Sequence, residues 1–148
     1  MLFYFTGTGN SLYVAKRLER QPISIPQVMH REDLTFSDDR IGIVAPIYGH
    51  EVPAMVREFL EKATFQTPYF YIILTYGNRH GGAAELAGQL CRECGITPAY
   101  INVILMVDNS AAVMILPTTF FDFTQEANDF YFPPLVGTYL RILRVTVF

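Results

Sequence analysis

A run of small polar residues directly follows the first apolar segment of the chain. This run, "TGTGNS" from Thr6 to Ser11, contains glycines whose backbone N–H groups can curl around an anion and hydroxyls that can donate to it. It contains no basic residue, and the next one is Lys16. The Gly-Lys-Ser/Thr ending of an ATP-binding loop is missing, and Leu12 stands where the third glycine of a dinucleotide-binding loop belongs. The run therefore predicts a site that anchors a phosphate without a positive side chain.

Two further loops combine glycine with aromatic and polar residues. They are "PIYGHEVP", which starts at Pro46, and "TYGNRHGG", which starts at Thr75. Each follows an apolar run, over 41–45 and 69–74, that predicts a buried strand. Ligands of open α/β sheets bind at the carboxyl ends of the strands. We therefore expect these two loops and "TGTGNS" to converge on one edge of a sheet.

Apolar runs alternate with segments of helical periodicity along most of the chain. This alternation predicts an α/β fold with three layers, a doubly wound parallel sheet between helices. With 148 residues, the chain predicts a single domain, 1–148. The expected strands are 2–5, 41–45, 69–74 and 100–107, with a proline-interrupted edge strand over 23–29 and a polar loop over 30–39; the expected helices follow Ser11, begin near Pro53 and cover 83–93.

Composition excludes several functional classes. A net charge of -3 without a basic stripe gives no reason to expect nucleic-acid binding. The longest apolar runs are far shorter than the ~18 residues of a membrane span. The start of the chain does not have the pattern of a secretory signal, and two cysteines make no disulfide framework. We expect a cytoplasmic protein without a membrane association.

The residues "FTGTGNS" after the first strand resemble the FMN-phosphate loop of flavodoxins, and the other two loops resemble that family's flavin-binding loops. Residues 1–110 are especially similar to the flavodoxin-like domains that precede a bacterial-type ferredoxin domain, although the C-x-x-C-x-x-C run of a ferredoxin is absent here. The resemblance implies strand order 2-1-3-4-5, non-covalent FMN, no catalytic residue and no metal. It further implies electron transfer with partner proteins, either a reductase or a ferredoxin-type donor or acceptor.

The resemblance also assigns residues to parts of the cofactor. The phosphate would be bound by Thr6, Gly7, Thr8, Gly9, Asn10 and Ser11. The isoalloxazine would be flanked by Pro46, Ile47, Tyr48 and Gly49, with Tyr48 as a stacking ring. The opposite ring face and the pyrimidine edge would be contacted by Thr75, Tyr76, Gly77, Asn78 and Gly82, with Gly81 as a further candidate.

The peptide between Tyr48 and Gly49 suggests a way to tune the cofactor. A carbonyl that turns toward flavin N5 accepts a hydrogen bond from the protonated one-electron-reduced ring. Because glycine has no Cβ, this turned state is inexpensive at Gly49. We therefore expect the Tyr48–Gly49 peptide to influence the one-electron potentials.

Histidines and cysteines are weaker candidates. His50 and His80 lie in the second and third loops, and a histidine in a loop is more often exposed to solvent than catalytic. Cys91 and Cys94 have the C-x-x-C spacing of a redox dithiol. They occur near the end of a predicted helix, however, where the helix dipole does not lower a thiol pKa. Packing is the better interpretation of both cysteines.

The chain departs from the flavodoxin pattern after about residue 110. Its C-terminal part is rich in phenylalanine and poor in charge, with a short helix expected over 122–129 and a helical stripe from Val136 to Val147. An exposed apolar surface there would pair with another copy or another protein, so both a monomer and a homodimer stay open. Two other functions also stay open: a small FMN-dependent reductase that reduces a quinone with a nicotinamide donor, and a flavin-free binding module.

Overall fold

A parallel sheet forms the centre of the molecule. The computed structural model describes residues 1–107, and its main sheet has five strands in the order β2-β1-β4-β6-β7, all paired in parallel. Taken in chain order, these strands give 2-1-3-4-5, the predicted order and that of flavodoxin-like folds. The strands are β1 (Leu2–Tyr4), β2 (Ile23–Ser24), β4 (Ile41–Pro46), β6 (Phe70–Tyr76) and β7 (Tyr100–Leu105).

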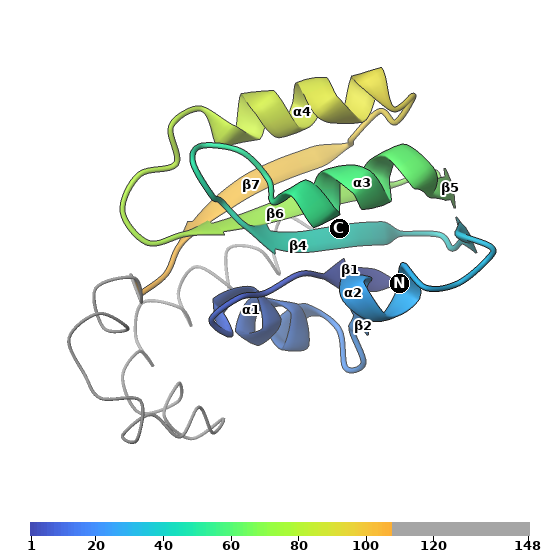
Figure 1. Cartoon of the computed structure of the whole chain (residues 1–148), viewed down its shortest axis with the longest axis horizontal. Coiled ribbons are helices and arrows are strands. Elements are labelled where there is room, and N and C mark those ends of the chain that lie inside the picture. Colours follow the sequence, from blue (N-terminus) through green and yellow to red (C-terminus); the bar gives the residue numbers. More distant parts are fainter. Residues whose placement is uncertain (108–148) are drawn as a thin grey trace.

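Helices cover both faces of this sheet, which confirms the predicted three layers (Figure 1). Helix α1 (Asn10–Leu18) buries Val14 and Ala15 against β1, β4 and β6 on one face. The other face is covered by α2 (Ile25–Val28), α3 (Ala54–Lys62) and α4 (Ala83–Glu93). Because β4 is buried from both sides, its sequence reads as a continuous apolar run rather than as an alternating one. The expected helices near Pro53 and over 83–93 are confirmed.

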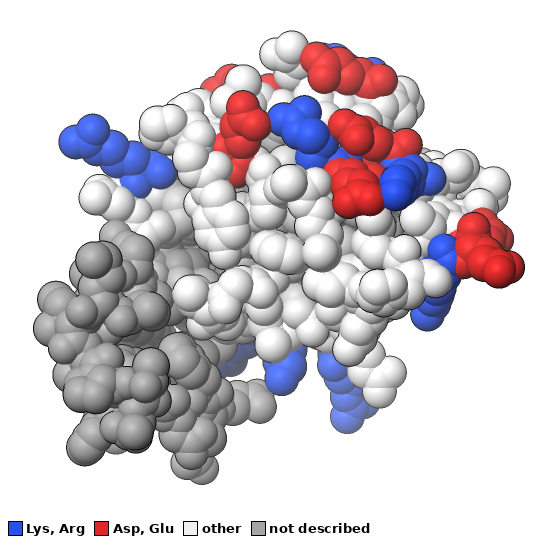
Figure 2. Space-filling view, in the orientation of Figure 1, with Lys and Arg blue, Asp and Glu red and all other residues white. Residues whose placement is uncertain are grey.

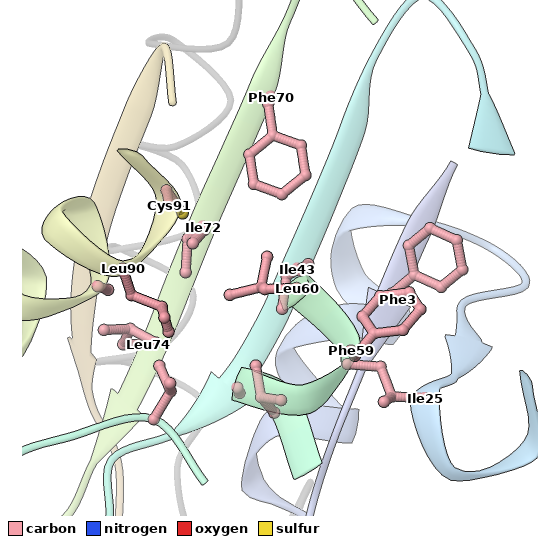
Figure 3. Close-up of a cluster of buried hydrophobic side chains, with 14 of the residues drawn as sticks. Phe3, Ile25, Ile43, Phe59, Leu60, Phe70, Ile72, Leu74, Leu90 and Cys91 are labelled. Carbon is pink, nitrogen blue, oxygen red and sulfur yellow. The ribbon is translucent and has the colours of Figure 1, made fainter. Parts of the chain in front are cut away.

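Aromatic rings fill the core between the sheet and α3. Phe3 and Phe59 are fully buried, and their ring centroids lie 5.1 Å apart (Figure 3). Phe36 lies edge-on to Phe3 at 4.6 Å, and Phe65 lies 5.5 Å from Phe59. These last two rings come from a separate two-stranded sheet, formed by β3 (Thr35–Ser37) and β5 (Thr64–Gln66). Edge-to-face contacts of this kind add to the free energy gained from burial.

Two segments between β1 and β4 differ from the prediction. Only Ile23–Ser24 forms the expected edge strand, and Ile25–Val28 is helical. The fixed φ and missing N–H of Pro26 suit the first turn of a helix, and this turn buries both Ile25 and Val28. The expected loop over 30–39 contains β3, because Phe36 is drawn into the aromatic core while its neighbours stay exposed.

The predictions for the C-terminal part lie outside the described residues. This applies to the helix over 122–129 and to the stripe from Val136 to Val147. Within residues 1–107, no helix is both long enough and apolar enough to pass through a membrane.

A glycine in the central strand makes room for an aromatic ring. The ring of Tyr71 in β6 covers Gly42 in β4 so closely that a Cβ at this glycine would collide with it. Gly42 has ordinary backbone geometry, so its requirement is for space and not for a positive φ.

We expect Gly42→Ala to lower the free energy of unfolding by about 1–3 kcal/mol, the usual effect of overpacking. Chemical denaturation of the full chain measures this change. In a Tyr71→Ala background the same glycine substitution should have little effect, since the ring that it meets is gone. An equal penalty in both backgrounds would show that Tyr71 is not the cause.

Candidate functional site

The three loops predicted to converge do line one cavity. It has a volume of about 460 Å³ and lies at the carboxyl ends of β1, β4 and β6. Of the predicted site residues, Gly9, Gly49 and Gly82 do not line it, although they belong to the same loops. The lining consists of Thr6, Gly7, Thr8, Asn10, Ser11, Pro46, Ile47, Tyr48, Thr75, Tyr76, Gly77 and Asn78, together with Arg79 and Val107, which the sequence reading did not select.

The first loop presents an uncapped helix end to this cavity. Gly9 has a φ of 97° and precedes α1, and no side chain caps the helix N-terminus. The N–H of Gly9 donates to Oγ1 of Thr6 at 3.0 Å, which closes the turn. Thr8 is exposed and lines the cavity. Free N–H groups and the positive end of the helix dipole thus meet a hydroxyl, an arrangement that binds anions.

The side chain of Asn10 bonds to a segment that is distant in sequence. Asn10 is the first residue of α1, and its side-chain amide donates to the carbonyl of Val107 at 2.8 Å. The bond connects the start of α1 to the chain just after β7. Asn10 therefore holds two walls of the cavity together.

A buried hydroxyl pair connects the first loop to the third. Oγ of Ser11 and Oγ1 of Thr75 lie 2.8 Å apart, and both residues are almost fully buried. In this structure these two hydroxyls satisfy one another. The hydroxyls best placed for a ligand are consequently those of Thr6 and Thr8.

Tyr48 connects two of the loops that line the cavity. Its side chain is half exposed, and its hydroxyl lies so close to Gly7 that a Cβ there would collide with it. The ring thus reaches from the second loop to the first. Gly7 accordingly has a steric role toward Tyr48 besides any contact with a ligand.

The second loop is a tight turn. Tyr48 and Glu51 exchange two backbone hydrogen bonds of 2.9 and 3.1 Å, and the two residues between them, Gly49 and His50, have φ values of 58° and 73°. Positive φ at both central positions is typical of a type I′ turn. The carbonyl of Tyr48 already accepts the N–H of Glu51, so the flip predicted for the Tyr48–Gly49 peptide has to break this bond, at about 1 kcal/mol.

His50 connects the second loop to the third. Its imidazole ring packs against Gly81, where a Cβ would collide with three ring atoms. His80 contacts the ring of Tyr76 edge-on, with centroids 5.4 Å apart. Both histidines are exposed, and neither lines the cavity. In the sequence, the only trace of the His50 contact is the adjacent pair Gly81 and Gly82. The first of these glycines leaves the space that the imidazole ring of His50 occupies.

Arg79 is the only charged residue on the described lining of the cavity. It lies in the third loop directly after Asn78. The first loop indeed has no cation, as the sequence indicated, but the cavity as a whole has one. The described lining includes no Asp, Glu, His or Cys.

The two cysteines are packed away from this cavity. Cys91 is fully buried in the core between the sheet and α4, and burial followed by the proximity of Cys94 raises its pKa to about 12. Burial also raises the pKa of Cys94. Both thiols are thus protonated at neutral pH, which confirms the packing interpretation.

Comparison with solved structures finds similar proteins. A provisionally assigned flavoprotein from Bacteroides uniformis superposes with a TM-score of 0.56 and 14% identity, over 77% of this chain and 94% of the other. The two-electron reduced flavodoxin of Megasphaera elsdenii matches 74% of this chain and 88% of its own, with a TM-score of 0.48 and 19% identity. Together with the strand order, the first match identifies the fold as flavodoxin-like.

The C-terminal part resembles different proteins. The family model of the Bacillus/Clostridium GerA spore germination protein matches residues 102–148. Stage V sporulation protein AF of Bacillus subtilis is 46% identical over 43 residues, which make up 29% of this chain and 9% of that protein. This chain thus matches about a tenth of the length of that curated relative. The match begins in β7, close to the point where the sequence departs from the flavodoxin pattern.

The buried pair of Ser11 and Thr75 predicts a non-additive response. Ser11→Ala should lower the free energy of unfolding by about 1–3 kcal/mol, because it leaves the Thr75 hydroxyl buried without a partner. Thr75→Val should have a similar effect. The double variant should be more stable than the sum of the two losses predicts, and thermal or urea unfolding of all four proteins measures the difference. Strictly additive losses would show that the two hydroxyls act independently.

The contact between His50 and Gly81 predicts that a substitution of Gly81 lowers the free energy of unfolding by more than backbone strain alone would. Gly81→Ala should destabilise the chain more than Gly95→Ala, because both glycines have positive φ but only Gly81 has a ring above it. We expect about 1 kcal/mol for Gly95→Ala and about 1–3 kcal/mol more for Gly81→Ala, by denaturant titration. In a His50→Gly background this excess should disappear. If it persists there, something other than the imidazole ring opposes the added methyl group.

Proposed function

We propose that this chain binds FMN non-covalently in the cavity and carries electrons between partner proteins. One observation carries the proposal: a single cavity combines an uncapped helix N-terminus and the hydroxyls of Thr6 and Thr8 with the rings of Tyr48 and Tyr76. The first feature suits a phosphate, and the second suits a flat aromatic group. FMN contains both. Its redox chemistry, the uptake of one or two electrons, would come from the flavin ring itself.

The residues present fit such a ligand. A volume of about 460 Å³ lies within the usual range of small-molecule sites, about 300–1,000 Å³. The phosphate would accept hydrogen bonds from the first turn of α1 and from the hydroxyls of Thr6 and Thr8. Tyr48 and Tyr76 would contact the two ring faces, and Gly77 and Asn78 would contact the pyrimidine edge. Ser11 and Thr75 would support these groups through their mutual bond.

An electron carrier fits the described lining better than a reductase. A reductase that reduces a quinone would use a second pocket and a group that moves protons near neutral pH. No Asp, Glu, His or Cys lines the part of the cavity that residues 1–107 form. The half-exposed Tyr48 would instead place an edge of the flavin near the surface, where electrons can pass to a docked protein.

The partner would be a reductase or a ferredoxin-type protein in the cytoplasm. On the face drawn in Figure 2, acidic and basic side chains are interspersed over the region of α3 and α4. Two of the exposed ion pairs there are Arg57 with Glu51 and Lys62 with Glu58. A surface of mixed sign favours short-lived docking without strong electrostatic steering.

A second proposal concerns the biological setting. The matches of residues 102–148 to spore germination and sporulation proteins favour a role of the chain in a spore-forming bacterium. There the redox domain would act during sporulation or germination. Electron transfer and this setting are compatible, since they rest on different parts of the chain.

The purified full chain should be yellow or turn yellow on addition of FMN, and it should bind FMN more tightly than riboflavin. Thr8→Ala should weaken FMN binding roughly tenfold, because a hydrogen bond to a charged group contributes about 1.5–3 kcal/mol, and leave riboflavin binding unchanged. Flavin fluorescence quenching measures both affinities. Thr64→Ala is the matched control, since Thr64 is exposed at the start of β5.

Three outcomes would contradict the proposal in different ways. A chain that binds neither FMN nor riboflavin would be a flavin-free binding module. Equal affinity for the two flavins would remove the phosphate site from the first loop. Rapid bleaching of the bound flavin by NADH or NADPH alone, without a partner protein, would favour the reductase.

A further inference from the structure

Arg79 adds a positive charge to the third loop of the cavity, next to the contact between His80 and Tyr76. Resting on the FMN site proposed above, we propose that Arg79 selects the reduced, anionic state of the bound flavin ring over the oxidised, neutral one. It would thereby raise the two-electron reduction potential of the bound cofactor. This effect on the potential is separate from the binding contacts described above, and within the described lining we assign it to Arg79.

The surroundings of Arg79 leave its charge available to a ligand. The side chain is exposed, and within residues 1–107 it makes no hydrogen bond or ion pair with another residue. Arg57 and Lys62, by contrast, are paired with Glu51 and Glu58. Because the described lining has no carboxylate, nothing in it neutralises the guanidinium. An anion in the cavity would therefore experience most of its field.

The path of the third loop places this charge away from the phosphate end. Only the start of the third loop is bonded to the first loop, since Oγ of Ser11 lies 2.8 Å from Oγ1 of Thr75. Beyond that point the third loop packs on the second loop, because Gly81 lies against His50, and Arg79 is adjacent to His80, which contacts Tyr76. A phosphate held at the N-terminus of α1 leaves the rest of the ligand to extend toward Arg79. The cavity thus offers two separate positive regions, one for each end of such a ligand.

The numbers of electrons and protons that the flavin ring takes up show why a cation near the ring matters. A redox partner protein supplies two electrons, and solvent supplies one proton, which binds at N5 of the ring. If no second proton binds, the ring keeps one negative charge. Opposite unit charges about 6 Å apart, at an effective dielectric constant of about 40, attract one another enough to strengthen binding roughly tenfold, and Arg79 would act on the reduced ring in this way. The oxidised ring is neutral and gains little.

The experiment compares the full chain with three variants: Arg79→Gln, Arg79→Lys and Arg20→Gln. Arg20 is the control, because it lies beyond the far end of α1, about 15 Å from the cavity. Dissociation constants for oxidised FMN and for oxidised riboflavin are measured by fluorescence. The potential of each bound flavin is measured by anaerobic titration with dithionite.

We expect Arg79→Gln to bind both oxidised flavins within about twofold of the unsubstituted chain, since the neutral ring gains little from the charge. Its preference for the reduced state should fall roughly tenfold, which lowers the two-electron potential by about 30 mV for either flavin. Arg79→Lys should restore most of the preference, and Arg20→Gln should match the unsubstituted chain. The difference should shrink at acidic pH, where the reduced ring takes up its second proton.

Other results would overturn the inference. An unchanged potential in Arg79→Gln would show that the guanidinium does not act on the ring. Weaker binding of FMN but not of riboflavin would place Arg79 on the phosphate instead. If the unsubstituted chain binds no flavin, the proposed function itself fails; if it binds FMN and Arg79→Gln leaves the potential unchanged, only this inference fails.

Discussion

The parallel pairing of β4 with both β1 and β6 determines where the cavity lies. Each of these strands ends at the same edge of the sheet, so the loops after Tyr4, Pro46 and Tyr76 have to meet there. The loops are separated by tens of residues along the chain, so the sheet brings their starting points together before the contacts between them can form. The register of β4 with β1 and with β6 places the ends of all three strands, and with them the points where the three loops begin.

Features with a strong local signal could be predicted from the sequence. The periodicity of Ala83–Glu93 and the apolar run of β4 give both the type and the place of these elements. The convergence of the three loops follows from the α/β alternation alone. The short elements could not be predicted. Phe36 forms a strand because rings distant in sequence surround it. Pro26 lies in the first turn of a helix, and its fixed φ fits a helix as well as it fits a strand edge.

Within the site, residue types were predictable and partners were not. Ser11 and Thr75 each suggested a ligand contact, but the bond between them is formed across 64 positions of sequence. The glycines of this chain also have partners that are distant in sequence. Gly42 and Gly81 each lie beneath an aromatic or imidazole ring and Gly7 lies against the hydroxyl of Tyr48, and for Gly7 and Gly42 the requirement is space alone. A sequence shows that a glycine is present, whereas the reason for it is often a side chain from another strand.

The bond from Asn10 to the carbonyl of Val107 has a mechanical consequence. It ties the first residue of α1 to the point where the chain leaves the sheet after β7. Tension applied through the segment that follows would therefore reach the first turn of α1 directly, without passing through the core. The same turn presents its N–H groups to the cavity. Anion binding at this turn and the position of Val107 would thus be coupled through one hydrogen bond.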